Sequence, residues 1–151
     1  MVRQEHEELE DATVDELHGN GRFGVSADIS REMVRLYKTQ FGRGPTGVRT
    51  HWAGDDMIVV ILENTLTPAE RNMVKMGEHQ RIRDIRMFFQ YATVREFCEP
   101  VEHLTGRKVR SFLSAIDTEV DGLAMETFLL HPEGYGGPSR IQSAEPAEPH
   151  A

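Results

Sequence analysis

The chain has 151 residues, with 25 acidic and 17 basic side chains and a formal net charge of −8. A chain of this length can bury a hydrophobic core as one domain. Most of the charge lies at the ends, because residues 1–24 hold seven acids against two bases, so the nearly neutral middle excludes the basic surface typical of nucleic-acid binding.

Neither the composition nor the amino terminus points to secretion or to the membrane. Cys98 is the single cysteine and cannot form an internal disulfide, and the chain starts without the basic and apolar segments of a signal peptide. The longest aliphatic run, residues 57–62, is much shorter than the about 20 residues of a membrane-spanning helix. We expect a cytoplasmic protein with no direct membrane insertion.

Both ends of the chain are predicted to be mobile tails. Residues 1–25 are acidic and poor in large apolar side chains, although a transient helix over 4–18 is compatible with them. Residues 132–151 are rich in Pro, Gly and Ala. Such segments bury too little apolar surface to offset the entropy of ordering, so the folded domain is predicted to span residues 26–131.

The first half of this domain is predicted to be a helix followed by a β-hairpin. Ser26 or Asp28 is the expected helix cap, and Gly42 the expected end. The apolar side chains between them recur at helical spacing: Ile29, Met33, Leu36, Tyr37 and Phe41. Residues 46–53 and 57–63 then form two strands around an acidic glycine turn.

The second half repeats this order after a long helix. The segment 67–70, TPAE, is a capping box, and the apolar positions after it predict one helix of about seven turns that Gly77 weakens by about 1 kcal/mol. Pro100 is placed near the start of a short helix that Gly106 closes. Residues 108–116 and 123–130 are predicted strands.

Two αββ units, the second a degenerate copy of the first, therefore predict a two-layer α+β sandwich. The four strands would form one antiparallel sheet with the helices on one face. Residues 57–62 are apolar on both sides of their strand, so the opposite face would also expose aliphatic side chains. A homodimer, or another partner, is expected to cover that face.

Candidate metal ligands lie in the second hairpin turn, residues 117–122. Asp117, Glu119 and Asp121 match the first part of a calcium-binding loop, but the twelfth position, which needs a glutamate, is Phe128. The alternatives are a solvated acidic turn and a weak divalent-cation site. No HExxH or paired CxxC is present, so we expect no metal or other cofactor, and acidic neighbours disfavour Cys98 as a nucleophile.

Arginines form a second candidate set, for an anion or a nucleotide. Planar guanidinium groups bind carboxylates and phosphates in pairs of hydrogen bonds, although nearby acids such as Glu78, Asp84 and Glu102 could equally hold them in ion pairs. A phosphate loop is not present, since GRGPTG lacks the Lys-Ser/Thr ending. The candidate ligands are Arg43, Arg81, Arg86, Arg107 and Arg110.

Residues 29–131 resemble the MpsC-like family, a domain long listed as having unknown function. The resemblance rests on residues 29–73, 78–92 and 101–130, and LTGRKV with the following ID-x-E-x-D is its most specific part. The family is named after a Na⁺-translocating, membrane-potential-generating system, and some members are linked to membrane partners that handle ions or inorganic carbon. No catalytic residues are established for the family, so none is carried over.

The resemblance implies a non-enzymatic accessory or regulatory subunit that associates with a membrane transporter subunit. A chain without a spanning segment cannot itself move ions across a bilayer, so any role in transport is expected to be peripheral, through a protein partner. Two alternatives remain open at this point. One is a sensor of a small anion or nucleotide, based on the arginines, and the other is a metal-dependent enzyme, based on the acidic turns and His103.

Overall fold

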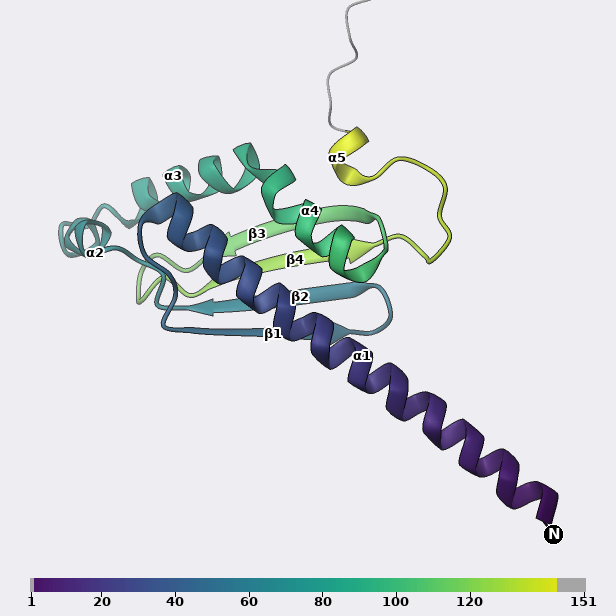
Figure 1. Ribbon diagram of the computed structural model, residues 1–151. Helices are drawn as coiled ribbons and strands as arrows, with labels where there is room; N and C mark the ends of the chain where they lie inside the picture. The colour runs from purple at the N-terminus through teal and green to yellow at the C-terminus, as the bar shows by residue number, and fades with distance from the viewer. Residues whose placement is uncertain (1, 144–151) are drawn as a thin grey trace, which may run out of the picture.

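The structure is a computed structural model that describes the backbone of residues 2–143 and the side chains of residues 21–143. Figure 1 shows the elements in chain order. They are α1 (Val2–Phe41), β1 (Gly47–Ala53), β2 (Met57–Glu63), α2 (Pro68–Lys75), α3 (His79–Ala92), α4 (Val94–Thr105), β3 (Val109–Ile116), β4 (Ala124–Leu130) and α5 (Arg140–Ser143).

The four strands form one antiparallel sheet in the order β1-β2-β4-β3, which confirms the predicted α+β fold. Each predicted strand is present to within a residue or so of its expected bounds. The two hairpins meet at the centre of the sheet, where Val60 of β2 lies opposite Glu126 of β4. The outer strands β1 and β3 are the two edges.

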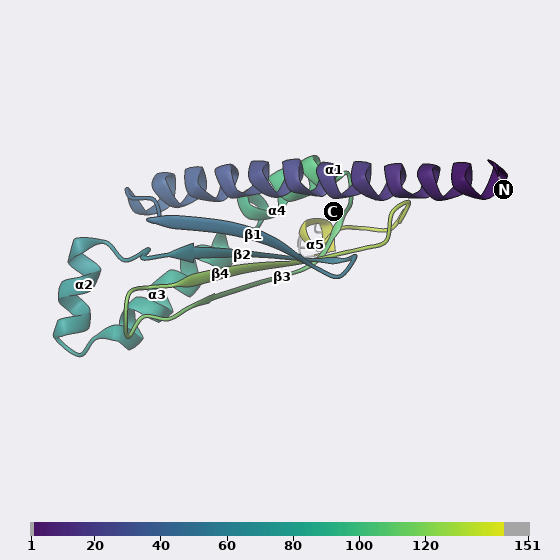
Figure 2. The same cartoon turned by 90° about the horizontal axis from the view of Figure 1, so that it is seen from below.

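Helices α1 and α4 pack on the sheet face that holds the core (Figure 2). The predicted apolar stripe of α1 is confirmed, because Ile29 and Met33 are completely buried. The sheet contributes the alternate residues of β2 and β4 to this face, and α4 contributes its own apolar stripe. The buried apolar side chains from these three elements are Ile58, Val60, Leu62, Val94, Phe97, Cys98, Val101, Ala124, Phe128 and Leu130.

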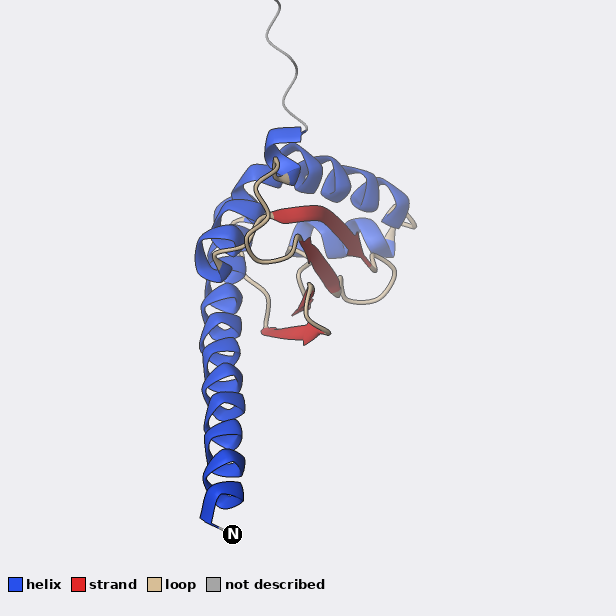
Figure 3. Cartoon of the chain, turned by 90° about the vertical axis from the view of Figure 1, so that its right-hand side faces the viewer, coloured by secondary structure: helices blue, strands red, loops and turns tan. Residues whose placement is uncertain are grey.

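Helix α3 lies along the free edge of β3, and α2 extends beyond the end of the sheet (Figures 2 and 3). The Tyr91 hydroxyl oxygen accepts a hydrogen bond from the backbone N–H of Ser114 at 3.2 Å, so α3 satisfies part of the unpaired strand edge. The predicted layout with all helices on one face is therefore not confirmed.

Helix α1 is much longer than predicted. It runs without interruption from Val2, so the predicted start at Ser26 or Asp28 is wrong. Residues 2–25 contain no proline, and each of their glycines costs only about 1 kcal/mol, so the helix that α1 forms on the domain can continue backwards. This first part projects away from the sheet as a rod (Figure 1).

The expected long helix after residue 67 is two helices. Gly77 adopts a left-handed φ of +79° and ends α2, so α3 begins separately at His79. Pro100 lies inside α4, six residues after its first residue, rather than near a helix start. Its ring removes one hydrogen bond, whereas burial of Phe97 and Val101 on either side holds the helix together. Gly106 ends α4 as predicted, with φ +67°.

Residues 132–143, predicted to belong to a mobile tail, are packed against the domain. Ile141 of α5 is buried, and the Lys108 ammonium donates to the Gly137 carbonyl at 2.5 Å. Ser139 and Gln142 also cap each other across the first turn of α5. One buried isoleucine and this cap are enough to order a segment that composition alone marks as flexible. The rest of that predicted tail, 144–151, lies outside the described residues.

No helix within residues 2–143 combines the length and the apolar content that a bilayer crossing requires.

The two hairpin turns give a matched stability test. Gly54 and Gly122 both have a left-handed φ, +75° and +74°, but a Cβ at Gly122 would lie 2.5 Å from Leu66 Cγ whereas one at Gly54 would meet nothing. Gly54→Ala should therefore cost about 1–2 kcal/mol for the left-handed backbone alone. Gly122→Ala should cost clearly more, because it also displaces a buried leucine. Urea unfolding of both variants measures the difference, and equal losses would contradict the close contact.

Candidate functional site

The most unusual part of the structure is the inner face of α3. Its buried residues are Ile82, Arg86 and Gln90, spaced four apart along one side of the helix. An arginine and a glutamine thus occupy positions where a surface helix normally presents apolar side chains to the core. These two side chains hold α3 to the rest of the domain through polar contacts.

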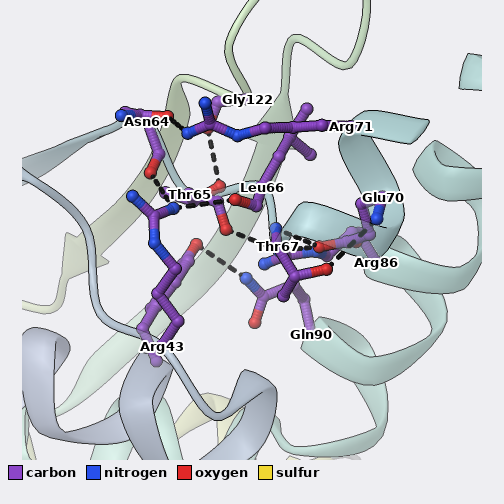
Figure 4. A network of polar contacts seen from close by, with 11 residues as sticks. Arg43, Asn64, Thr65, Leu66, Thr67, Glu70, Arg71, Arg86, Gln90 and Gly122 are labelled. Atoms are coloured by element: carbon purple, nitrogen blue, oxygen red, sulfur yellow. Dashed lines mark hydrogen bonds and ion pairs between the residues drawn. The ribbon is translucent and has the colours of Figure 1, made fainter. Parts of the chain in front are cut away.

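Arg86 connects α3 with the start of α2 and the preceding loop (Figure 4). Its guanidinium donates to both carboxylate oxygens of Glu70, at 2.8 and 2.6 Å, and to the backbone carbonyl of Thr65 at 2.7 Å. The guanidinium carbon also lies 3.7 Å from the centre of the Phe41 ring. The arginine is 1% exposed. A bidentate pair of this kind is specific in geometry, and removal of either partner leaves a buried charge.

Glu70 has a second role in the predicted capping box, which the structure confirms. Its side chain accepts the backbone N–H of Thr67 at 2.9 Å, and the Thr67 hydroxyl accepts the backbone N–H of Glu70. Burial acts to raise the pKa of Glu70, but the hydrogen bonds from Arg86 and Thr67 outweigh it and hold the pKa below its ordinary value. The carboxylate is therefore ionised and shared between the helix cap and Arg86.

Gln90 reaches a second buried carboxyl group, Glu126, at the centre of β4. The Gln90 amide donates to Glu126 Oε1 at 2.8 Å and to the Tyr37 hydroxyl oxygen at 2.8 Å, and that hydroxyl donates to Glu126 Oε1 at 2.7 Å. Glu126 has no exposed surface. Burial raises its pKa to about 8, which the hydrogen bond from Tyr37 only partly opposes, so the carboxyl group is largely protonated at neutral pH.

Beside its polar inner face, α3 carries an exposed apolar stripe. Ile85, Phe88 and Phe89 are 51%, 71% and 44% exposed. The Phe89 ring contacts Phe88 at 6.0 Å and Phe41 at 6.2 Å between centroids. Side chains of this size on one outward face form an apolar patch, here called the α3 patch, that is typical of a binding surface.

Two of the five predicted anion ligands have equivalent structural roles. Arg43 donates to the backbone carbonyls of Asn64 and Leu66, at 2.7 Å each. Arg107 donates to the carbonyls of His131 at 3.0 Å and Asp55 at 2.6 Å. Each arginine follows the glycine that ends its helix and binds the residue directly after the second strand of its own hairpin. Gly42-Arg43 and Gly106-Arg107 therefore have the same role, which is to tie the end of a helix to the end of the hairpin in each αββ unit.

The other predicted ligands are not brought together with these two. Arg86 is committed to Glu70, and Arg81 pairs with Glu78 at 2.9 Å on the surface. Arg110 is exposed on β3. Of the five predicted ligands, Arg43 and Arg86 approach the same loop, residues 64–66, and both bind its backbone carbonyls (Figure 4). The arrangement gives the anion-sensor hypothesis no support.

The acidic hairpin turn uses its carboxylates locally. Asp117 accepts the N–H of Glu119 at 3.0 Å, and Asp121 accepts the N–H of Leu123 at 3.1 Å. The Glu119 carboxylate lies 3.2 Å from His79. Over the described part of the chain, no three His, Cys, Asp or Glu side chains are placed to hold a metal ion together. The predicted cation site and the metal-enzyme hypothesis built on it gain no support from this geometry.

Cys98 is a core side chain. It is completely buried, and burial, with the charge of Glu102 as a smaller contribution, raises the pKa of its thiol to about 12. A thiol in this environment stays protonated and is a poor nucleophile.

Sequence reasoning did not single out Glu126 or Gln90. The signal was present, since Glu126 falls on the inward-facing alternation of 124, 126, 128 and 130, and Gln90 is one turn after Arg86. A carboxylate at an inward strand position predicts a buried partner set, which here comes from α1 and α3.

Glu126 should make the stability of the protein fall as pH rises. In the unfolded chain Glu126 has its ordinary pKa, so between about pH 4.5 and 8 only the folded state keeps the proton. The free energy of unfolding of the wild type therefore falls by about 1.4 kcal/mol per pH unit in this range. Glu126→Gln has no such ionisation, so the stability of the variant should rise relative to that of the wild type from pH 5 to pH 8. Urea unfolding at each pH measures it, with Glu133→Gln as the exposed control. A constant gap would mean that Glu126 is ionised in the folded protein.

A comparison with protein families agrees with the resemblance seen in the sequence. The model of the family described as "Na+-translocating membrane potential-generating system (MpsC)" matches residues 24–131. The match includes the whole sheet, helices α2 to α4 and the part of α1 that packs on the core. No curated protein and no solved structure matches the chain. Because the family match spans most of the sequence, the chain belongs to the MpsC family.

Proposed function

We propose that this protein is a non-catalytic accessory subunit of a membrane system that translocates Na⁺ and generates a membrane potential. It acts in the cytoplasm, as a homodimer, and reaches the membrane through a protein partner. The family membership supports the link to such a system. The observation that carries the accessory role is the α3 patch, because α3 exposes Ile85, Phe88 and Phe89 while it buries Arg86 and Gln90.

The α3 patch is held in place by interactions that do not depend on a partner. Arg86 and Gln90 fix the rotation of α3 about its axis through Glu70 and Glu126. A helix free to rotate would bury its phenylalanines, as the hydrophobic effect favours. The patch is thus presented as a rigid surface, which lowers the entropy cost of binding.

The second sheet face supports the homodimer. It carries the alternate residues of the strands that do not face α1 and α4. Leu113 of β3 and Met125 of β4 are 56% and 37% exposed, and the neighbouring side chains are partly buried. The apolar centre of this face, here called the open face, consists of Met57, Val59, Ile61, Leu113, Met125 and Leu129.

The size of the open face suits a small specific dimer. Four strands spaced by about 4.8 Å, each with seven residues or so rising about 3.3 Å, cover about 440 Å² in plan. Side chains add to the accessible area, so pairing two such faces about a twofold axis reaches the order of 1,000 Å² that a specific interface needs. In a twofold dimer, the open face of one copy would pack against the identical open face of the other.

The dimer is tested with a charge on the open face. The wild type should have about twice the mass of the 17.2 kDa chain in sedimentation equilibrium. Met125→Lys should shift it to the monomer, because a lysine at the centre of the interface would be buried without a partner. Val120→Lys is the control, since Val120 is 75% exposed in the hairpin turn, away from the open face. A monomeric wild type at tens of micromolar would rule the dimer out.

The accessory role is tested by affinity purification from membranes in mild detergent. The tagged wild type should retain an integral membrane protein that mass spectrometry identifies and that retains this protein in the reciprocal experiment. Phe88→Ser should reduce the recovery at least tenfold, because it removes the most exposed side chain of the α3 patch. Val120→Ser is the matched control, since Val120 is 75% exposed in the β3–β4 turn. Recovery of no membrane protein by the wild type would refute the role.

A further inference from the structure

A groove of about 650 Å³ runs between α1 and α4 on the side of these helices that faces solvent. Its apolar residues are Leu36 from α1 and Pro100 and Leu104 from α4. Leu36 belongs to the core cluster and Leu104 packs against it, so the floor of the groove is continuous with the hydrophobic core. Two packed helices leave a channel of this kind, into which the side chains of a third helix can pack.

Proline contributes to the depth of the groove. Pro100 has a compact ring where most helix-forming residues would place a long side chain, and it lies in the middle of α4. The compact ring of Pro100 therefore adds to the depth of the groove.

The rim of the groove is acidic. Three glutamates, Glu32, Glu96 and Glu99, line it together with Arg35 and His103, a formal net charge of −2 with the histidine counted as neutral. Arg35 pairs with Glu32 at 2.7 and 3.1 Å, and Arg95 pairs with Glu99 at 3.2 Å, so Glu96 is the rim carboxylate outside these two pairs. Glu96 is exposed on α4.

The negative charge continues along α1 beyond the groove. Residues 2–24, which form most of the projecting part of α1, carry seven acids against two bases, a net charge of −5. A segment that lies in the groove and follows α1 would meet this charge along its length. Such a field favours a basic partner and repels an acidic one.

At its other end the groove adjoins the α3 patch. Gln40 and Thr93 line the groove and are joined by a hydrogen bond of 2.9 Å, and the Thr93 hydroxyl donates to the Phe89 carbonyl at 2.7 Å. Phe89 in turn contacts Phe41, the neighbour of Gln40. A partner bound through the α3 patch would therefore reach the groove directly.

We infer that this groove binds a basic amphipathic helix of the membrane partner, with apolar side chains on Leu36, Pro100 and Leu104 and Lys or Arg side chains against the acidic rim. This inference rests on the proposed function. Membrane proteins concentrate Lys and Arg in their cytoplasmic loops close to the bilayer, which is the chemistry that the rim complements. Apolar anchors at helical spacing in a groove between helices are an established mode of peptide recognition.

The test uses a fluorescent 18-residue helical peptide of leucine and lysine, and a matched peptide of leucine and glutamate, in anisotropy titrations with the full chain. The lysine peptide should bind and the glutamate peptide should not. Glu96→Lys should weaken binding of the lysine peptide at least tenfold. Glu119→Lys makes the same change in net charge in the β3–β4 turn, outside the groove, and should weaken binding less than twofold.

Equal weakening by the two variants would show attraction to the acidic chain as a whole and would overturn the inference, as would the absence of binding to the wild type. Circular dichroism melting of both variants checks that each is folded. Membrane purification separates this inference from the proposed function. If Glu96→Lys retains the membrane protein as well as the wild type does, the inference fails and the function stands. If the wild type retains none, the function itself fails.

Discussion

The buried polar contacts of α3 are the constraint on which the rest of the molecule depends. Arg86 and Gln90 must face inward, because Glu70 and Glu126 are their partners in the interior. Once these positions are fixed, the helical periodicity turns Phe88 toward solvent and leaves Phe89, three residues after Arg86, partly exposed beside Phe41. Polar contacts thus replace apolar packing beneath much of α3, and the α3 patch stays exposed to solvent. Stability and recognition are set by the same helix rotation.

Arg43 and Arg107 make the same kind of contact in the two halves of the domain. After each left-handed glycine, Arg43 or Arg107 binds the backbone beyond the last strand of its unit. Carbonyl groups that emerge from a strand end need a donor, and a guanidinium supplies several in a fixed geometry. An arginine at such a position carries a structural task, so its presence in a cluster of arginines says little about an external anion.

The strands and their pairing into two hairpins could be predicted from the sequence, because alternation and two glycine turns specify hairpins locally, whereas the contact of β2 with β4 is seen only in the structure. The burial of Ile29 and Met33 followed from helical spacing in the same way. The break at Gly77, the interior position of Pro100 and the long start of α1 could not, because each depends on how neighbouring segments pack. The α3 patch was not predicted, because helical spacing alone does not say which side of α3 packs on the domain. The contacts of Arg86 with Glu70 and of Gln90 with Glu126 decide it.

The antiparallel contact of β2 with β4 places a local twofold axis between the two αββ halves, and this has a consequence for the origin of the domain. A shorter chain that encoded one half could already close the same four-stranded sheet by associating with itself. When two such halves are joined in one polypeptide, their sequences no longer have to be identical. Here the linker between them holds α2 and α3, which have no counterpart in residues 131–143, the described segment after the second hairpin. The difference between the two halves thus lies mainly in the segment that connects them.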